Sequence, residues 1–385
     1  MINRCDSNMK ILMILSKEFT IDPRVYKEAK SLIDAGHQVT VLMWDRKGES
    51  EKESKIEGIR VLRFRNTFSM NILPNDILRN PIWWRNAYTK GLKLFKNGFY
   101  FDVVHCHDLD TLQIGIWLKK KLKVKLIYDA HEIFGYMIEN SVPKIVSKYS
   151  FRMEKRLLKY VDYIITVNEP LHDYFKSISD KPVSIVMNCN KLIIKEYVPT
   201  NNKIFIISYI GVLSSNRFFP QIIDKLAEIK DIKFVIAGRL ENLDIYKQVE
   251  KSAIKYCNVT FLGTIPVNKV IPLTMESDCV LCPLDPSFKS HKVALANKQF
   301  DAMVCGKPII CTKGTYPGNL TEKLNCGLIV DYNLDAIKEA VVKLKDNPTL
   351  CEEFGRNGLE AAKKKYNWDI QKHIFLQLYK NLNQN

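Results

Sequence analysis

The sequence predicts an α/β protein with two doubly wound parallel sheets, and three observations support this. Short apolar runs rich in β-branched residues alternate with helical stretches, the alternation breaks at residues 189–203, and it then starts again. At 385 residues the chain is too long for one ordinary core and suits two domains. We expect Rossmann-like domains whose sheets face each other across a cleft, where folds of this kind bind ligands.

The strands of the first half are identified by their apolar runs. Several are continuously apolar, as is typical of strands buried on both faces of a parallel sheet. Between the first two, Val25, Ala29, Leu32 and Ile33 repeat at helical spacing, and Gly36 ends that helix. The succession of strand, helix, glycine and strand is a βαβ unit. The predicted strands span 10–15, 38–43, 59–64, 102–105, 124–128, 162–167 and 183–187.

The second half repeats the pattern after a polar segment that we interpret as a linker. Its predicted strands span 204–210, 232–237, 258–262, 278–282, 308–311 and 328–330, and helices close the chain. We therefore predict a first domain at 1–190, a linker at 191–203, a second domain at 204–366 and a C-terminal helix at 367–385.

Composition limits the location and the partners. Hydrophobic content of 46% with 26% charged residues is ordinary for globular proteins, and no apolar run is long enough to span a bilayer or to form a signal peptide. We expect a cytoplasmic protein with reduced, buried cysteines. Cys279 and Cys282 have the spacing of zinc ligands, but no second pair completes a site, so alternation in a strand explains them better.

The formal net charge of +16 calls for an explanation. Nucleic acid, anionic membrane and anionic small molecules are the candidate partners. No RNA-recognition, zinc-finger or helix-turn-helix pattern is present, and the cations are dispersed, so we do not expect nucleic-acid binding. A general excess of lysine on helix faces would also explain much of the charge.

The segment 294–308 is the most informative stretch of the chain. Asn297, Lys298 and Asp301 lie near the predicted start of a short helix, before a turn of small residues and an apolar strand. Free N–H groups at a helix start, a lysine and a carboxylate one turn later can hold a diphosphate and a ribose diol. The alternative is an amphipathic helix with a solvated aspartate.

Two other strand ends carry a glycine and a cation. Gly211 follows the first strand of the second half, and Arg217 enters near the next helix start, where its guanidinium can bind phosphate oxygens. Arg239 directly follows the glycine of the next strand. A plain connection with a surface arginine is the alternative. Neither loop has the spacing of a dinucleotide-binding motif or a P-loop.

In the first half, polar residues follow three strands. His105 and His107 lie on the same side of a strand end, but without a clear third ligand they do not indicate a metal, and we expect them to line the cleft or to satisfy local hydrogen bonds. His131, next to Glu132, lies at the predicted mouth of the cleft; a structural capping histidine is the alternative. Arg24 follows a helix start that an Asp-Pro pair marks. It lies where phosphate or acceptor could approach, and a solvent-exposed arginine is the alternative.

Two basic stretches indicate a possible membrane contact. Apolar residues at 145, 149, 153, 157 and 160 form a helical stripe beside a cationic stripe, and residues 81–96 mix interfacial aromatics with cations. Both stretches could hold the first domain against anionic lipid. A solvated helix face packed on the sheet remains the alternative for the first stretch.

The order of these motifs over 9–370 resembles the retaining GT-B glycosyltransferases, specifically glycosyltransferase family 4. The resemblance rests on Tyr-Ile-Gly at 209–211, Phe-Val-Ile-Ala-Gly-Arg at 234–239, and Asn-Lys-Gln-Phe-Asp to Gly-Lys-Pro at 297–308. In the first half it rests on Asp-Pro-Arg at 22–24, His-Cys-His-Asp at 105–108 and Asp-Ala-His-Glu at 129–132. It implies an N-terminal acceptor domain, a C-terminal nucleotide-sugar domain, and a last helix that crosses back to the first domain.

The resemblance also implies roles for individual residues, in an enzyme without a metal or other cofactor. Arg217, Lys298 and Gly211 would bind the diphosphate of the donor, and Asp301 and Arg239 the nucleoside. Ala296 and Asn297 would contact the donor sugar, and His131 would act at the reacting centre. Residues that would line the cleft or bind the acceptor are Arg24, His107 and Glu132.

The chain departs from the family pattern at two positions. Val293 stands where the family has a glutamate facing the donor sugar, and Val212 stands where it often has an arginine. The expected function is retaining transfer of a hexose from a UDP- or GDP-sugar to a glycan or lipid-linked acceptor. A sugar-nucleotide epimerase or a silent binding protein is the alternative. We expect the enzyme in the cytoplasm, in peripheral contact with the inner face of the cell membrane.

Overall fold

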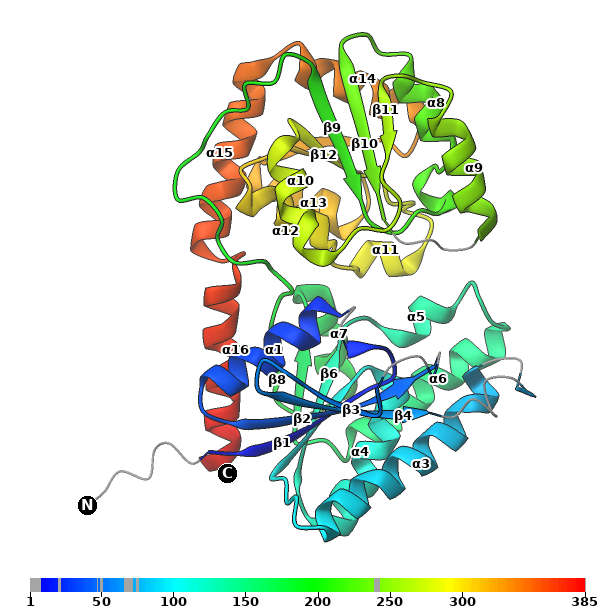
Figure 1. The fold of residues 1–385 in the computed structure, drawn as a ribbon, viewed down its shortest axis with the longest axis vertical. Helices are drawn as coiled ribbons and strands as arrows, with labels where there is room; N and C mark the ends of the chain where they lie inside the picture. Colours follow the sequence, from blue (N-terminus) through cyan, green and yellow to red (C-terminus); the bar gives the residue numbers. More distant parts are fainter. Residues whose placement is uncertain are drawn as a thin grey trace. The chain divides into compact units, whose positions relative to one another are not determined.

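The computed structural model describes residues 8–19, 22–46, 48, 51–65, 72–73, 76–238 and 243–384. Contacts divide the chain into two compact units (Figure 1). The first unit comprises Met1–Val186 with Lys372–Asn385, and the second comprises Met187–Gln371. Within the described part of the chain, no helix is both long and apolar enough to cross a bilayer.

The first unit is built on an eight-stranded sheet of order β3-β4-β2-β1-β5-β6-β7-β8. All neighbours are parallel except β3 and β4. The strands are β1 (Lys10–Leu15), β2 (Gln38–Asp45), β3 (Glu53–Ile56), β4 (Ile59–Arg65), β5 (Val103–His107), β6 (Lys125–Ala130), β7 (Tyr163–Thr166) and β8 (Val183–Ile185).

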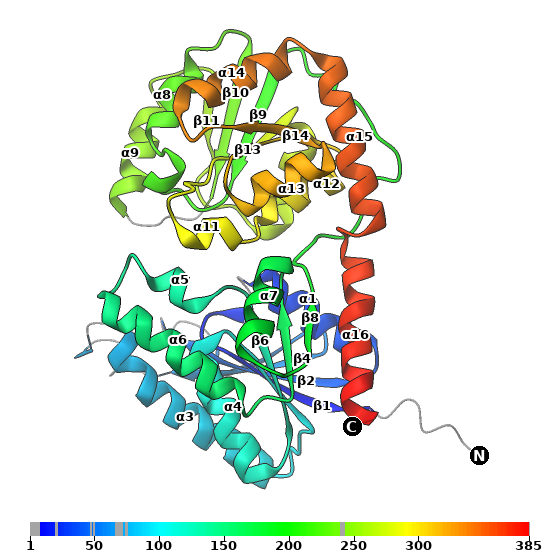
Figure 2. The same cartoon turned by 180° about the vertical axis from the view of Figure 1, so that it is seen from behind.

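Helices cover both faces of this sheet (Figures 1 and 2). Helix α1 begins where the Asp22 carboxylate accepts hydrogen bonds from the backbone N–H groups of Arg24 and Val25, and Pro23 occupies its first turn. The helices are α1 (Pro23–Asp34), α3 (Asp76–Lys96), α4 (Leu109–Leu122), α5 (Phe134–Ile138), α6 (Lys144–Leu158) and α7 (Glu169–Ile178).

The last helix, α16 (Trp368–Gln384), begins in the second unit and continues in the first. In the first unit, Phe375 and Tyr379 are fully buried, and the Tyr379 hydroxyl lies 2.7 Å from Nδ1 of His105. The helix thus completes the core of a unit whose other described residues all precede residue 187.

The second unit contains a fully parallel six-stranded sheet of order β11-β10-β9-β12-β13-β14. In its core, buried aliphatic and aromatic side chains of the strands, such as Ile207, Phe234 and Leu281, pack against the helices. The strands are β9 (Phe205–Ile210), β10 (Ile232–Ala237), β11 (Val259–Phe261), β12 (Cys279–Cys282), β13 (Ile309–Thr312) and β14 (Gly327–Val330).

Helices flank this sheet on both sides as well (Figure 2). The α-helices are α8 (Gln221–Ala227), α9 (Leu243–Ala253), α10 (Val270–Glu276), α11 (Lys289–Val293), α12 (Asn297–Val304), α13 (Tyr316–Leu324), α14 (Leu334–Lys345) and α15 (Pro348–Lys364). Two short 3₁₀ helices, η2 (Ser215–Arg217) and η3 (Val267–Lys269), lie in loops.

The predicted α/β class with parallel sheets is confirmed, and every predicted strand has its counterpart in the two sheets. The sequence analysis missed β3, an exposed antiparallel strand that joins β4 through a turn at Glu57 and Gly58. Cys279 and Cys282 are buried strand residues, and all cysteines among the described residues are free thiols.

Helix α6 divides the apolar stripe for which the sequence left two alternatives, a membrane contact and a helix face packed on the sheet. Ile145 is 76% and Tyr149 58% exposed, whereas Leu157 is buried. The helix instead packs through Ser147, Ser150 and Glu154 at its other positions.

Candidate active site

In the second unit, the end of β9 and the start of α12 meet. Gly211 follows β9, and a Cβ atom there would lie 2.9 Å from Nζ of Lys298. The same ammonium lies 3.6 Å from the centre of the Tyr209 ring, a cation–π contact. Gly211 therefore gives the second residue of α12 the room to reach the end of β9.

Arg217 reaches the same strand end from η2. Its Nη1 donates to the carbonyl oxygen of Val212 at 3.1 Å, and its buried Nε has no hydrogen-bond partner in the described structure. A buried N–H group without a partner is costly, so its presence points to a ligand that accepts the missing hydrogen bond.

The start of α12 has no side-chain cap, because Ala296 occupies the N-cap position. Its first N–H groups are therefore open to an anion, and Asn297 is exposed beside them. Asp301 is only 7% exposed and accepts a hydrogen bond from the side chain of Asn190. The alternative of a solvated aspartate is thus wrong.

The charge of Lys298 depends on its burial and on its charged neighbours. Burial lowers the pKa of Lys298 to about 7, Cys282 and Asp301 counteract this, and Arg217 adds to it. An anion that binds beside Lys298 would restore its positive charge. These groups form a cluster at the end of β9, which we call the cationic pocket and define as Gly211, Arg217, Lys298, Asp301 and the start of α12.

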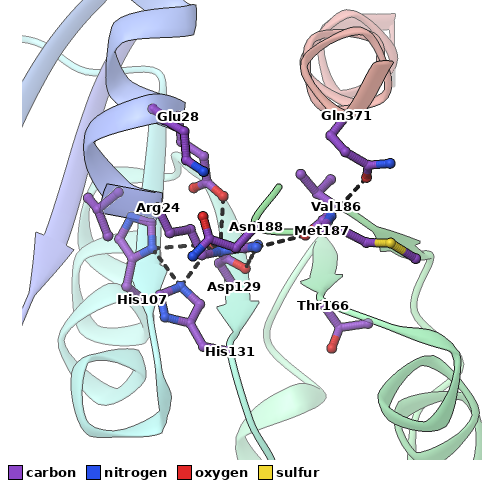
Figure 3. Close-up of polar contacts among 12 residues, drawn as sticks. Arg24, Glu28, His107, Asp129, His131, Thr166, Val186, Met187, Asn188 and Gln371 are labelled. Carbon is purple, nitrogen blue, oxygen red and sulfur yellow. Dashed lines mark hydrogen bonds and ion pairs between the residues drawn. The ribbon is translucent and has the colours of Figure 1, made fainter. Parts of the chain in front are cut away.

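In the first unit, the carboxyl ends of β5 and β6 bring three side chains together (Figure 3). His107 and Asp129 are register partners on these strands, and His131 follows β6 directly. One oxygen of Asp129 lies 3.2 Å from Nδ1 of His107 and 3.2 Å from Nε2 of His131. The other ring nitrogen of His131 lies 3.4 Å from Asp108.

Arg24 points into the interior of the first unit, so the alternative of a solvent-exposed arginine is wrong. Its guanidinium binds both oxygens of Asp129, at 3.2 and 2.7 Å, and donates to the carbonyl oxygen of Val186 at 2.7 Å. Its Nε also lies 3.1 Å from Glu28. Only 2% of the Arg24 surface is exposed.

These contacts set the protonation of the cluster. Burial lowers the pKa of His131, but Asp108 and Asp129 outweigh it and raise that pKa to about 9. Burial and His105 lower the pKa of His107 to about 3. His131 is therefore an imidazolium at neutral pH, while His107 stays neutral.

The two acids behind Arg24 shift in opposite directions. Burial raises the pKa of Glu28 well above its usual range. Burial also acts on Asp129, but Arg24 and His131 prevail and hold its pKa well below the usual range. Glu132 beside them is half-buried, and burial together with Asp108 raises its pKa to about 7.

Four residues of this cluster have the ligand types of a metal site. Glu28, His105, His107 and Asp129 each offer a ligand atom, and all four atoms lie within 4.8 Å of one another. However, the Arg24 guanidinium already pairs with the Asp129 carboxylate and contacts Glu28, so it would repel a metal cation at this position. We therefore interpret Glu28 and Asp129 as members of an ion-pair network, which we define as Arg24, Glu28, Asp108, Asp129 and His131.

The residues predicted from the sequence thus lie in two separate clusters. Gly211, Arg217, Lys298 and Asp301 meet in the cationic pocket, with Ala296 and Asn297 at the same helix start. His107 and His131 meet in the first unit, where His107 is fully buried. The prediction for Arg239 lies outside the described residues.

The sequence analysis missed Asp129 and Glu28 as partners of Arg24. A signal was present for each. Asp129 is a carboxylate at the end of an otherwise apolar strand, and Glu28 lies one turn after Arg24 on the buried side of α1. Charged residues at buried positions call for a partner.

Comparisons with known proteins agree with this architecture. Residues 24–189 match the model of Glycosyltransferase Family 4, and residues 205–347 match that of Glycosyl transferases group 1. An uncharacterised glycosyltransferase of Methanocaldococcus jannaschii is 22% identical over 357 residues, covering 86% of this chain and 87% of that protein. A second one from the same organism is 22% identical over 311 residues, covering 80% of this chain and 82% of that protein.

Solved structures with the same fold span nearly the whole chain. Sucrose-phosphate synthase from Thermosynechococcus elongatus has a TM-score of 0.78 at 16% identity, covering 98% of this chain and 100% of that one. Anabaena HepE, solved in complex with UDP and glucose, has a TM-score of 0.70 at 15% identity, with the same coverage of both chains. With two parallel Rossmann-like sheets, a last helix shared by both units and two adjoining family matches, this chain is a GT-B glycosyltransferase that belongs to glycosyltransferase family 4.

Proposed function

We propose that this glycosyltransferase transfers a hexose from a nucleotide-diphosphate sugar to a glycan or lipid-linked acceptor, with retention of anomeric configuration. The observation that carries the proposal is the cationic pocket. Among the described residues its Arg217 has a buried N–H without a hydrogen-bond partner, and its Lys298 lies over an aromatic ring in the first turn of an uncapped helix. Such a pocket is built to receive an anion.

The chemistry requires that negative charge on the leaving diphosphate be stabilised as the glycosidic bond breaks. In our proposal Arg217, Lys298 and the first N–H groups of α12 supply this stabilisation without a divalent metal. Asp301, one turn into the helix, accepts hydrogen bonds from the ribose hydroxyls. Asn297 and the backbone at Ala296 contact the sugar.

The first unit contributes an imidazolium in this proposal. His131 carries a positive charge at neutral pH and is oriented by Asp108 and Asp129, so it can donate a hydrogen bond to the sugar or to the developing charge. Glu132, next along the chain, meets the acceptor. We assign no general base, since the leaving phosphate can itself accept the acceptor's proton.

Two solved relatives favour a uridine nucleotide as the donor. Anabaena HepE has been solved in complex with UDP-glucose, and an E. coli structure with a TM-score of 0.68 holds UDP-2-fluoro glucose. Both are less than 25% identical to this chain, so they support the choice of a first substrate and leave the sugar to experiment.

Titration calorimetry with UDP-, GDP- and ADP-sugars tests the donor site directly. We expect Arg217→Ala to weaken binding about 30-fold, because a charge-assisted hydrogen bond is worth about 2 kcal/mol. Asp301→Asn should weaken nucleotide binding but not binding of inorganic pyrophosphate. Lys338→Ala, which removes a half-exposed cation of the same unit that pairs with Glu228, is the matched control.

Unchanged affinity in both Arg217→Ala and Asp301→Asn would remove the proposed donor site. A labelled donor then separates the reaction classes. Label transferred to an added glycan or lipid acceptor supports the proposal, whereas an altered sugar without acceptor would identify an epimerase. Binding without turnover of any donor would identify a silent homologue.

A further inference from the structure

Helix α6 of the first unit exposes large apolar side chains, which a helix that only packs on the core would bury. Ile145 is 76% and Tyr149 58% exposed, one helical turn apart on the same side. The packing face is made instead by Ser147, Ser150, Glu154 and two leucines near the end. Large apolar side chains gathered on a solvent face indicate a surface that has a partner.

The charge of α6 indicates that the partner of this surface is anionic. Over residues 144–159 the exposed cations are Lys144, Lys148, Arg152, Lys155, Arg156 and Lys159. The one acid in this stretch, Glu154, is buried and accepts hydrogen bonds from the hydroxyls of Tyr128 and Tyr174, both at 2.8 Å. The outward face of the helix is therefore cationic without an opposing charge of its own.

The neighbouring helices continue this surface. Between α3 and α4 lies an open groove of about 620 Å³, lined by Pro81, Arg85, Tyr88, Trp117, Lys120 and Lys121. Cations and aromatic rings line it, and no acid does. Lys120 also lies 4.0 Å from the centre of the Tyr160 ring, just after α6, which links the groove to that helix.

The three helices lie side by side on one face of the first sheet (Figures 1 and 2). Cations beside aromatic and aliphatic side chains are typical of proteins that lie on a bilayer, since the cations bind lipid phosphates and the apolar groups enter the acyl region. Tyrosine and tryptophan suit the boundary because each has an apolar ring and a polar atom.

We propose that α3, α4 and α6 form a docking surface for an anionic phospholipid bilayer. Ile145 and Tyr149 enter the bilayer, the α6 cations bind headgroups around them, and the groove between α3 and α4 takes one lipid phosphate against Arg85, Lys120 and Lys121. This inference goes beyond the proposed function, because none of these residues belongs to the cationic pocket or to the ion-pair network. It places the acceptor unit at the membrane surface, where a lipid-linked acceptor would be found.

Co-sedimentation of the full chain with vesicles tests this surface. We expect binding to vesicles that contain phosphatidylglycerol and none to vesicles of phosphatidylcholine alone. The double variant Ile145→Ser with Tyr149→Ser should lower the partition coefficient at least about tenfold, because two buried apolar side chains are lost from the interface. Arg85→Gln and Lys121→Gln should each lower it about fivefold.

The second unit offers a matched control. Ile254 is 79% exposed and has Lys251 and Lys255 nearby, yet Lys255 is paired with Asp224. Ile254→Ser should leave vesicle binding unchanged. A comparable loss in this variant would reduce the effect to general adsorption of a basic protein and overturn the proposal.

Two further outcomes would also overturn it: no binding of the wild-type protein to phosphatidylglycerol vesicles, or full binding by the Ile145→Ser, Tyr149→Ser variant. Nucleotide-sugar affinity is measured in solution on the same variants. Because the changed side chains are exposed, we expect that affinity and the thermal midpoint to stay at wild-type values. Failure of the docking surface is thereby distinguished from failure of the donor site.

Discussion

The ion-pair network of the first unit and the cationic pocket of the second differ in how their charged side chains are paired. In the first unit, Arg24 is paired with Asp129, and His131 with Asp108 and Asp129. In the second unit, Arg217 keeps a buried N–H without a partner among the described residues, and Lys298 loses much of its charge to burial. Paired charges stabilise the fold and orient side chains such as His131, whereas cations without a paired carboxylate can bind an anionic ligand.

The largest test of this contrast removes Arg24. Arg24→Met should cost the first unit about 3–5 kcal/mol, because it leaves the buried Asp129 without its main partner. Chemical denaturation measures the loss. The control is Lys119→Met, which breaks a half-exposed pair with Asp162 in the same unit and should cost less than about 1 kcal/mol.

A double variant makes this test stricter. Arg24→Met combined with Asp129→Asn should lose clearly less than the sum of the two single changes, because the second change removes the uncompensated charge. Additive losses would mean that the two side chains do not act as a pair.

The protonation of His131 gives the next effect. Its folded pKa of about 9 lies above the unfolded value of about 6.5, so the folded state binds the proton more tightly. This stabilisation is fully present below pH 6.5 and is lost as the pH rises through 9, by up to about 3 kcal/mol. His131→Asn should remove that part of the stability-against-pH curve.

The comparison is best made above pH 7.5. Glu132, whose pKa is raised to about 7, also destabilises the folded state as the pH rises, but only up to that point. Wild-type and variant curves of equal slope between pH 7.5 and 9 would refute the charged state assigned to His131.

On the other side of the contrast, the affinity of the cationic pocket should depend on pH. The pKa of free Lys298 is about 7, and a bound diphosphate favours its charged form, so binding takes up a proton. Affinity for a UDP-sugar should fall between pH 7 and 8.5 by about tenfold per unit at most. In Lys298→Met the profile should be flat; a slope equal to the wild type's would assign the proton to another group.

The smallest effect concerns the room that Gly211 provides. In Gly211→Ala the new methyl group would lie 2.9 Å from the flexible end of Lys298, which can move away. We expect a several-fold loss of nucleotide affinity with a change in stability below about 1 kcal/mol. A large loss of stability instead would show that the strand end itself requires glycine.

The sequence predicted the parallel strands because they are buried on both faces and therefore apolar throughout. It did not predict β3, whose side chains alternate between exposed and half-buried and carry no apolar run. It also did not predict which side of α6 faces the sheet, since a small polar face built on Ser147, Ser150 and Glu154 looks like a solvent face in the sequence.

For the candidate site, the sequence identified residues that share one strand end or one helix turn. Lys298 and Asp301 lie one turn apart on α12, so their proximity follows from helical spacing alone. Arg24 and Asp129 are separated by 105 positions, and only the register of the sheet and the entry of α1 bring them together. Pairings of this kind cannot be read from spacing.

The last helix has a consequence for synthesis. Phe375 and Tyr379 fill the interior of a unit whose other described residues end at Val186. A ribosome therefore makes the whole second unit before it supplies the side chains that close the first. Until then the nascent N-terminal half exposes apolar side chains beside His105. A recombinant fragment that stops at residue 186 lacks Phe375 and Tyr379, so these side chains stay exposed in it.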